Sequence, residues 1–299
     1  MILFIDENDE GKRLDSYLSE ITPDFSRSKI QNFIKSGDTK INGIEKKSSY
    51  ILKEGDKIDF EISKEDFSIK PQNIELDIIY EDENMLVLNK PSGMLTHPTS
   101  VERENTLVNA LLYKYENNLS DINGEFRRGI LHRLDRNTSG LLMVAKNNKA
   151  HEFLAKQIKE HAITKKYRAI VKGNIDKNEF EINEPIGRNP NQPHKMMVRP
   201  DGKPSLTKIK VIEGFKEATY VELELVTGRT HQIRVHMANI KHPVFNDTLY
   251  GAGMAKIKTE EQVLQSFYLR FTKPFGNEII ELQIEPDEKI TKILKYLRS

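Results

Sequence analysis

Residues 129–142 read GILHRLDRNTSGLL. Asp135 lies between Arg133 and Arg136, and small turn-forming residues follow it before an apolar run that predicts a buried strand at residues 141–145. Loops held by rigid strands commonly carry catalytic groups, and neighbouring guanidinium groups favour the ionised form of a carboxylate. From the residues alone, two interpretations are equally good. The loop is either a surface salt-bridge loop or the site of a nucleophilic or basic carboxylate.

Apolar runs on both sides of this loop predict a strand-rich domain at residues 76–299. Strands are predicted at residues 78–80, 85–88, 141–145, 167–171, 209–212, 220–226 and 279–284, and helices after Thr106, at 150–158 and after Asp287. Because the strands outnumber the helices and do not alternate regularly with them, we predict an α+β fold. Its sheet is expected to be mixed, mainly antiparallel and flanked by helices.

A second, smaller α+β unit is predicted at residues 11–62. Ser26 is a suitable N-cap for a helix that ends at Gly37. Asn42-Gly43 lies between two short strand-like runs, which is typical of a type I′ hairpin. Residues 63–75 are polar, contain a proline and lack sustained periodicity, so they predict a linker between the two units.

The composition excludes several classes of protein. The chain of 299 residues contains no cysteine, which excludes disulfides, thiolate metal sites and cysteine nucleophiles. There is no apolar run of membrane-spanning length, and the acidic N-terminus does not resemble a signal peptide. We therefore expect a cytosolic protein without a membrane partner, and nothing in the sequence requires more than a monomer.

The distribution of charge is more informative than the net charge of +1. Residues 161–172 and 227–242 contain Lys, Arg and His but no acid, whereas acids concentrate at residues 6–10, 54–66 and 75–83. Such segregation permits a positive face that binds phosphates. For any one segment taken alone, solvated surface charge is the better explanation.

Four motifs now give the sequence a family likeness. They are Asn89-Lys-Pro-Ser-Gly93 with His97-Pro98, His132-Arg-Leu-Asp-Arg-Asn-Thr-Ser-Gly140, Lys166-Tyr-Arg-Ala169 and Thr227-Gly-Arg-Thr-His-Gln-Ile-Arg-Val-His236. In this order they closely resemble the pseudouridine synthases of the RluA/RluD type, the ribosomal large subunit synthases among them. Residues 11–62 resemble the RNA-binding module of small ribosomal subunit protein four, which many such synthases carry.

The resemblance implies a role for each catalytic candidate. Asp135 matches the aspartate that attacks the sugar or removes its C2′ proton, and Tyr167 matches an aromatic residue that packs against the base. Arg229 matches the basic residue that pairs with the aspartate, and Arg133 matches a side chain that fills the gap left by a flipped-out nucleotide. The isomerisation is redox neutral, so no cofactor and no metal are expected.

Further residues are candidate RNA contacts. These substrate-binding candidates are His132, Asn89, Lys90, Arg136, Thr138, His231 and Arg234 in the larger domain, and Arg27 and Lys29 in the smaller one. Asn89 and Lys90 support the cleft or contact phosphate. His231, His236 and His242 have spacings that match no common metal-binding helical pair, so no metal site is predicted.

The expected function is isomerisation of specific uridines in structured RNA, with 23S rRNA as the substrate. The same chemistry on tRNA is an alternative. A non-catalytic RNA-binding or ribosome-assembly protein is a second alternative. A third is a metal-assisted hydrolase that uses His97, His132 and Asp135. The presence of Asp135 together with Tyr167 and Arg229 favours the synthase.

Overall fold

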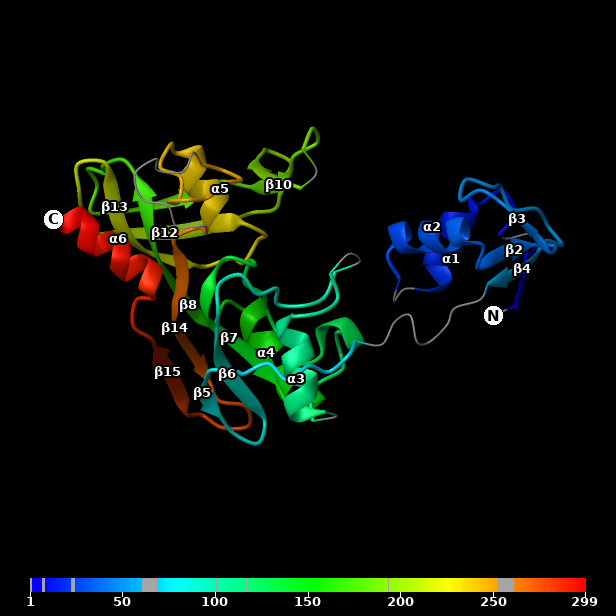
Figure 1. Ribbon diagram of the computed structural model, residues 1–299, viewed down its shortest axis with the longest axis horizontal. Helices are drawn as coiled ribbons and strands as arrows, with labels where there is room; N and C mark the ends of the chain where they lie inside the picture. Colours follow the sequence, from blue (N-terminus) through cyan, green and yellow to red (C-terminus); the bar gives the residue numbers. More distant parts are fainter. Residues whose placement is uncertain are drawn as a thin grey trace. The chain divides into compact units, whose positions relative to one another are not determined.

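A computed structural model describes residues 2–6, 9–22, 25–60, 69–99, 102–116, 118–192, 194–251 and 261–299. The chain forms two compact units (Figure 1). The smaller unit comprises residues 1–69 and 99–102, and the larger unit comprises residues 70–98 and 103–299. Within the described ranges, no helix is both long and apolar enough to span a membrane.

The smaller unit combines two helices with an antiparallel sheet. Its elements are β1 (Ile2–Phe4), α1 (Leu14–Ile21), α2 (Arg27–Ser36), β2 (Thr39–Ile41), β3 (Ile44–Glu45) and β4 (Lys57–Phe60). The sheet order is β1-β4-β2-β3. Strand β1 lies before residue 11, where the sequence analysis began the unit, because its pairing with the distant β4 leaves no local signal.

Local signals in this unit are confirmed. Ser26 is the N-cap of α2, and the helix ends at Gly37, which has a left-handed φ of 90°. The hairpin residues Asn42 and Gly43 both have positive φ, 52° and 78°, as a type I′ turn requires.

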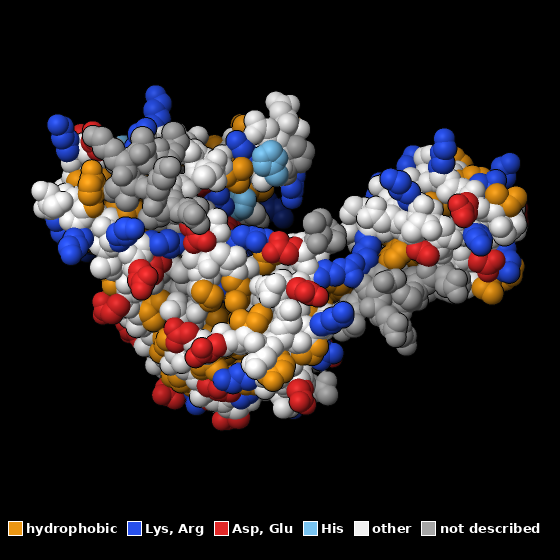
Figure 2. All heavy atoms as spheres, in the orientation of Figure 1, with side chains coloured by type: hydrophobic (Ala, Val, Ile, Leu, Met, Phe, Trp, Pro, Cys, Tyr) orange, Lys and Arg blue, Asp and Glu red, His pale blue; other side chains and the backbone are white. Residues whose placement is uncertain are grey.

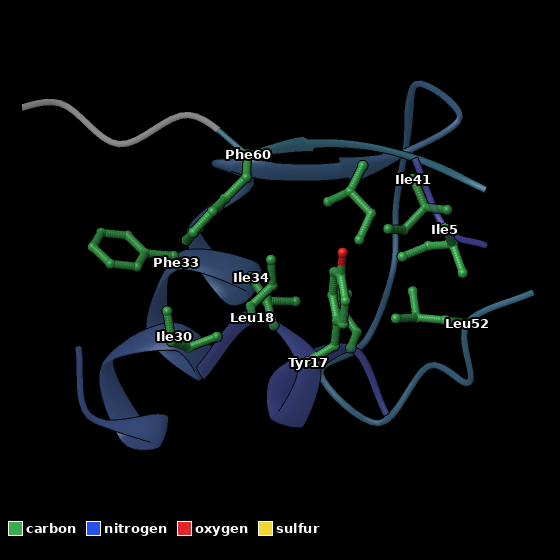
Figure 3. Packing of buried hydrophobic residues seen from close by; sticks show 11 residues of the cluster. Ile5, Tyr17, Leu18, Ile30, Phe33, Ile34, Ile41, Leu52 and Phe60 are labelled. Carbon is green, nitrogen blue, oxygen red and sulfur yellow. The ribbon is translucent and has the colours of Figure 1, made fainter. Parts of the chain in front are cut away.

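The core of the smaller unit lies between its helices and its sheet (Figure 3). Leu18 and Ile30 from the helices are fully buried, as is Ile58 from β4. Phe33 packs edge-on against Phe60 with ring centroids 5.9 Å apart. This cluster uses residues of the smaller unit alone.

Asp15 is a fully buried carboxylate in α1 of this unit. It accepts hydrogen bonds from Arg13, Arg27 and Gln31 at 2.7–3.2 Å. Burial by itself would raise the pKa of Asp15, but the hydrogen bonds from these three side chains outweigh it and hold the pKa well below its usual range.

We expect the smaller unit to lose stability as the pH falls below about 4, the pKa of a carboxyl in the unfolded chain. Because the folded-state pKa of Asp15 lies below that value, its carboxylate stabilises the fold at higher pH. This stabilisation is lost on acidification. D15N removes this dependence and costs about 1–2 kcal/mol at pH 7, since Arg13 and Arg27 are half exposed and partly screened. Urea unfolding followed by circular dichroism at pH 7 and pH 3.5 measures both effects. Equal pH dependence in the two proteins would contradict this account.

The larger unit is built on a long sheet. Its elements are β5 (Ile78–Glu81), β6 (Met85–Lys90), α3 (Leu107–Tyr115), a 3-10 turn (Glu125–Arg127), β7 (Ser139–Ala145), α4 (Asn148–Lys159), β8 (Thr164–Lys172), β9 (Glu179–Asn183), β10 (Ile186–Arg188), β11 (Met196–Val198), β12 (Leu206–Gly214), β13 (Ala218–Leu225), α5 (Gln232–Asn239), β14 (Leu264–Thr272), β15 (Ile279–Gln283) and α6 (Glu288–Arg298). Thr106 and Asp287 cap α3 and α6 as predicted.

The sheet order is β5-β6-β7-β14-β8-β13-β12-β9, with β15 paired to β14. The pairing of β7 with β14 is parallel and the other pairings are antiparallel. The predicted mixed, mainly antiparallel sheet and the α+β class are confirmed. Strands β10 and β11 form a separate two-stranded hairpin.

Gly140 lets two strands approach closely at the centre of this sheet. It pairs with Ser266 of β14 and has a φ of +114°. A Cβ at position 140 would lie 2.0 Å from the carbonyl oxygen of Ser266, so only glycine fits. Gly140, which the sequence analysis treats as a turn residue, therefore allows β14 to pair closely with β7.

Helices cover the sheet on the sides where apolar side chains face them. Leu154 of α4 packs with Met143 of β7 and Leu269 of β14, and Ile290 of α6 packs with Ile170 of β8 (Figure 1). All seven residues of β7 are buried, so both faces of this strand are covered. The loop that carries Asp135 leads directly into it.

The structure differs from the sequence analysis in its strands and in one boundary. The sequence analysis does not predict strands β9, β10, β11 and β14. Residues 70–75, included in the predicted linker, belong to the larger unit. Asn109 donates a hydrogen bond to the carbonyl of Lys70, and its own backbone carbonyl accepts the backbone N–H of Gln72. Residues 63–68 of the predicted linker lie outside the described residues.

Candidate active site

A pocket of about 490 Å³ opens in the larger unit. It is lined by residues 131–135 of the loop before β7, by Lys165 and Tyr167 of β8, and by residues 225–234, which run from the end of β13 into α5. The pocket thus collects segments that are far apart in the sequence. Asp135, Tyr167, Arg229 and Arg234 all line it.

Asp135 is partly buried, with 18% of its side chain exposed. Its Oδ2 accepts a hydrogen bond from Nη1 of Arg234 at 2.9 Å, and its Oδ1 lies 3.8 Å from Nε2 of His231. A carboxylate that accepts a hydrogen bond from a guanidinium is oriented by it. Asp135 can therefore act as a nucleophile or a base.

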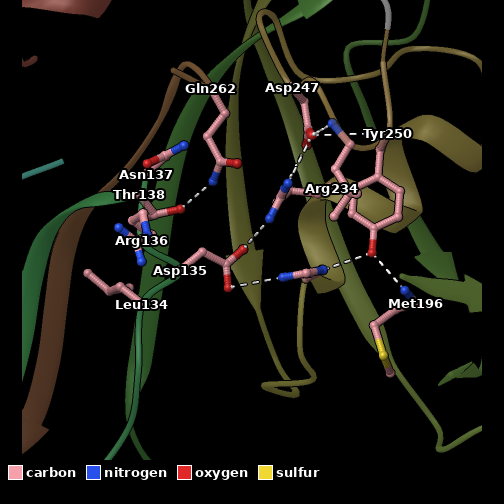
Figure 4. A network of polar contacts seen from close by, with 12 residues as sticks. Leu134, Asp135, Arg136, Asn137, Thr138, Met196, Arg234, Asp247, Tyr250 and Gln262 are labelled. Atoms are coloured by element: carbon pink, nitrogen blue, oxygen red, sulfur yellow. Dashed lines mark hydrogen bonds and ion pairs between the residues drawn. The ribbon is translucent and has the colours of Figure 1, made fainter. Parts of the chain in front are cut away.

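Arg234 joins Asp135 to a second carboxylate (Figure 4). Its Nε and Nη2 donate to the two oxygens of Asp247 at 2.7 and 2.9 Å. Burial lowers the pKa of Arg234, but the hydrogen bonds and charges of Asp247 and Asp135 outweigh burial and raise it. Asp247 is fully buried and also accepts the backbone N–H groups of Leu249 and Tyr250. The fork from Arg234 to Asp247 therefore fixes the direction from which Arg234 meets Asp135.

The ion pair assigned to Arg229 by the sequence analysis is made by Arg234 instead. Nε of Arg229 donates to the carbonyl oxygen of Pro204 at 3.1 Å. The reason is the chain geometry at the start of α5, where His231 takes a left-handed φ of 57°. Arg229 lies before this left-handed residue, whereas Arg234 lies in the first turn of α5. Arg229 still lines the pocket.

His231 connects the pocket to the hairpin β10–β11. Its Nδ1 is 2.8 Å from the hydroxyl of Tyr250, which accepts the backbone N–H of Met196 at 2.7 Å. On the other side of the ring, Nε2 lies 3.8 Å from Oδ1 of Asp135. Burial lowers the pKa of His231 and so favours a neutral ring.

Tyr167 is buried on β8 with 6% of its surface exposed. Burial raises the pKa of Tyr167, the hydrogen bond with Ser266 lowers it in part, and the charge of Asp135 raises it further. The phenol therefore stays neutral at physiological pH. The side chain of Tyr167 lines the same pocket as Asp135.

The other candidates of the same loop differ in their surroundings. Nε2 of His132 accepts the backbone N–H of Met143 at 3.1 Å, and burial lowers the pKa of His132 to about 3, so the ring is neutral. Thr138 is buried and accepts a hydrogen bond from Gln262 at 2.7 Å. His132 and Thr138 line the pocket, as does the exposed Arg133. The exposed Arg136 does not line it, within the described residues.

Lys90 supports the loop rather than contacting a phosphate. It is fully buried, and its Nζ donates to the carbonyl oxygens of Pro91, Met94 and Arg136 at 2.7–3.0 Å. Burial, followed by the charge of Lys289, lowers the pKa of Lys90 to about 7. Of the two roles predicted for Lys90, these contacts favour support of the loop, because its three donors face backbone oxygens. Asn89 donates to Asp77 at 2.9 Å and does not line the pocket.

The remaining candidates lie in the smaller unit, and two further histidines lie outside the cluster around Asp135. Arg27 is bound to Asp15 and half exposed, and Lys29 lies over the rings of Phe25 and Phe33. Figure 2 shows basic and acidic side chains interspersed on the face in view. His236 and His242 are bonded to different groups, Thr207 and the carbonyl of Lys172, so they do not converge with His231.

Two residues of the site carry no signal in the sequence analysis. Asp247 and Tyr250 lie 13 and 16 positions after Arg234, a separation without helical or strand periodicity. Their roles follow from tertiary contacts alone.

Comparison with known proteins decides the family. Residues 84–239 match the family model of the RNA pseudouridylate synthases, which is more than half of the chain. The chain belongs to the RNA pseudouridylate synthase family. Residues 12–58 match the S4 domain, which confirms the predicted N-terminal module.

The synthase is similar to curated relatives over nearly its whole length. It is 39% identical to an RNA pseudouridine synthase of Bacillus subtilis, covering 98% of this chain and 96% of the relative. It is 36% identical to the ribosomal large subunit pseudouridine synthase D of Escherichia coli, covering 99% and 93%. A solved structure, human RNA pseudouridylate synthase domain containing 1, aligns with a TM-score of 0.59 at 27% identity, covering 76% and 96%. The synthase is therefore an isomerase of the RluD type.

Proposed function

We propose that this enzyme converts uridines of large-subunit ribosomal RNA to pseudouridine, with Asp135 as the catalytic carboxylate. The observation that carries the proposal is the hydrogen bond from Arg234 to Asp135 at the pocket, with Arg234 itself anchored on Asp247. This arrangement presents an oriented carboxylate in a pocket that a buried tyrosine, Tyr167, also lines. Such a group suits attack on the ribose or removal of its C2′ proton.

The reaction requires the target nucleotide to leave the RNA helix. C1′ and C5 cannot exchange partners while the base is stacked, so the base is flipped into the pocket. Tyr167 then packs against the base, and Arg133, exposed at the pocket, fills the gap left in the RNA. Arg229 contacts the RNA backbone at the rim.

The choice of substrate rests on the relatives. Relatives from Escherichia coli and Haemophilus ducreyi, 36% and 35% identical, are named ribosomal large subunit pseudouridine synthase D. The S4 domain supports RNA as the partner. Transfer RNA is the alternative substrate, and the catalytic chemistry would be the same.

The test is to map pseudouridines in ribosomal and transfer RNA from cells with and without this gene. The proposal predicts that one or more sites in large-subunit RNA disappear and return with the wild-type gene. Loss of pseudouridine from transfer RNA alone would refute large-subunit ribosomal RNA as the substrate. Tritium release from C5-labelled ribosomal RNA in the presence of EDTA measures the reaction directly, and abolition by EDTA would contradict a metal-free reaction.

Deletion of residues 1–62 is expected to leave a folded, active domain with weaker or less selective RNA binding. The core cluster of the smaller unit contains residues 5–60 only, whereas the clusters of the larger unit begin at Met85. Thermal unfolding and RNA binding of the truncated chain measure the two effects. If the truncated chain is unfolded, the domain boundary does not lie near residue 62.

A further inference from the structure

Lys165 is a buried cation in the pocket that the steps above do not use. It is 9% exposed and lies on β8 two residues before Tyr167. Alternate residues of a strand point to the same face, and both side chains line the pocket. No carboxylate of the described residues lies within ion-pair distance of its Nζ. Its neighbour Lys166, on the other face, is paired with Glu222 at 2.9 Å.

Nζ of Lys165 can be located relative to the other walls. It lies 3.6 Å from the point that a Cβ on Gly228 would occupy, so it sits against the turn before α5. Burial, followed by the charge of Lys165, lowers the pKa of His132. The charge of Asp135 raises the pKa of Tyr167, whereas burial alone lowers that of Lys165. Lys165 and Tyr167, two positions apart on β8, line the same pocket as Asp135.

A buried cation without a counter-ion destabilises a fold, and such a group at a pocket suits a ligand that carries or develops negative charge. A uracil packed along Tyr167 lies next to Lys165, because the two side chains are neighbours on the same face of β8. The pocket thus places a positive charge beside the base.

We propose that Lys165 donates a hydrogen bond to a carbonyl oxygen of the flipped uracil and stabilises the negative charge that the base acquires during the reaction. This inference rests on the proposed function. The N1–C1′ bond breaks, and its electron pair passes to the uracil, shared by N1 and the two carbonyl oxygens. The ring then uses an electron pair at C5 to form the C5–C1′ bond. The C5 proton leaves to solvent and N1 takes a proton from solvent, while Lys165 stays protonated throughout.

The experiment compares K165M, K165R and the matched control K166M in the full-length enzyme. The probe is C5-tritiated large-subunit ribosomal RNA from cells lacking the gene, and the readouts are the single-turnover rate and the RNA Kd. K165M should lower the rate by about 100-fold or more, the loss expected for one donor to a developing anion. RNA Kd should stay within about twofold. K165R should recover part of the rate, and K166M should resemble wild type.

Stability and salt dependence separate this role from two others. K165M should have an unchanged or higher Tm, because the substitution removes an uncompensated buried charge; a lower Tm with a proportional loss of rate would mean a structural role. A weaker RNA Kd whose salt dependence falls by about one counter-ion would mean a phosphate contact and overturn the proposal. A K165M rate near that of wild type would also overturn the proposal. Absence of tritium release by the wild-type enzyme would instead refute the proposed function.

A change in the substrate tests the contact itself. Transcripts carrying 2-thiouridine or 4-thiouridine at the mapped target replace one carbonyl oxygen by sulfur, a weaker acceptor. One of the two should slow the wild-type enzyme but not slow K165M any further. If both slow the two enzymes equally, Lys165 does not donate to the base.

Discussion

D135A is expected to abolish pseudouridine formation, lowering the single-turnover rate by more than about 1,000-fold, and to leave RNA affinity within about twofold. The reason is a division of roles. The carboxylate performs the chemistry at the ribose, whereas affinity comes mostly from phosphate contacts elsewhere. The fold should persist, because Arg234 keeps its fork to Asp247 when Asp135 is lost.

The measurement is tritium release together with RNA binding by filter retention. D135N, which keeps the shape and loses the charge, should be as inactive as D135A. D176A changes a carboxylate that does not line the pocket and should resemble wild type. Turnover that persisted in D135A would contradict the assignment of Asp135 as the catalytic carboxylate.

R234M is expected to have the second large effect. It leaves two carboxylates, Asp135 and the fully buried Asp247, without their shared cation. Breaking such a buried pair costs about 3–5 kcal/mol of stability. The rate should fall by about 100-fold or more, because Asp135 loses the hydrogen bond that orients it at the pocket. R234K should recover little, since an ammonium cannot form the fork to Asp247.

Two comparisons make this result specific. R229A should reduce the rate far less than R234M, because Arg229 donates to the carbonyl of Pro204 and not to Asp135. The double variant R234M/D247N should regain part of the lost stability, since the buried charge at 247 is removed, without regaining activity. Urea unfolding and tritium release follow the two quantities. Equal losses in R229A and R234M would contradict the assignment of the ion pair.

Much of the local structure could be predicted from the residues. The caps at Ser26 and Gly37 and the hairpin at Asn42-Gly43 depend on interactions within a few positions, so short patterns report them. The same holds for the polar loop around Asp135 and the buried strand that follows it. The motifs also identified the family, because their residue types are tied to one chemistry.

Strand pairing over long separations could not be predicted in this way. Strand β14 inserts between β7 and β8, and its place depends on the missing Cβ of Gly140 against Ser266. No pattern within either strand contains that contact. A period of two identifies a strand but not its neighbours.

The sequence by itself determined that Asp135 is a carboxylate in an arginine-rich loop ahead of a buried strand, in a synthase with an N-terminal S4 domain. Only the tertiary structure decided which arginine meets it. Arg229 and Arg234 are five residues apart and equally basic, but the left-handed turn at His231 and the buried Asp247 bring Arg234 to the carboxylate. Lys90 and Lys165 differ in the same way, one held by backbone oxygens and one facing the pocket. Side-chain charge is a property of the residue, whereas its partner depends on which distant segments the fold brings together.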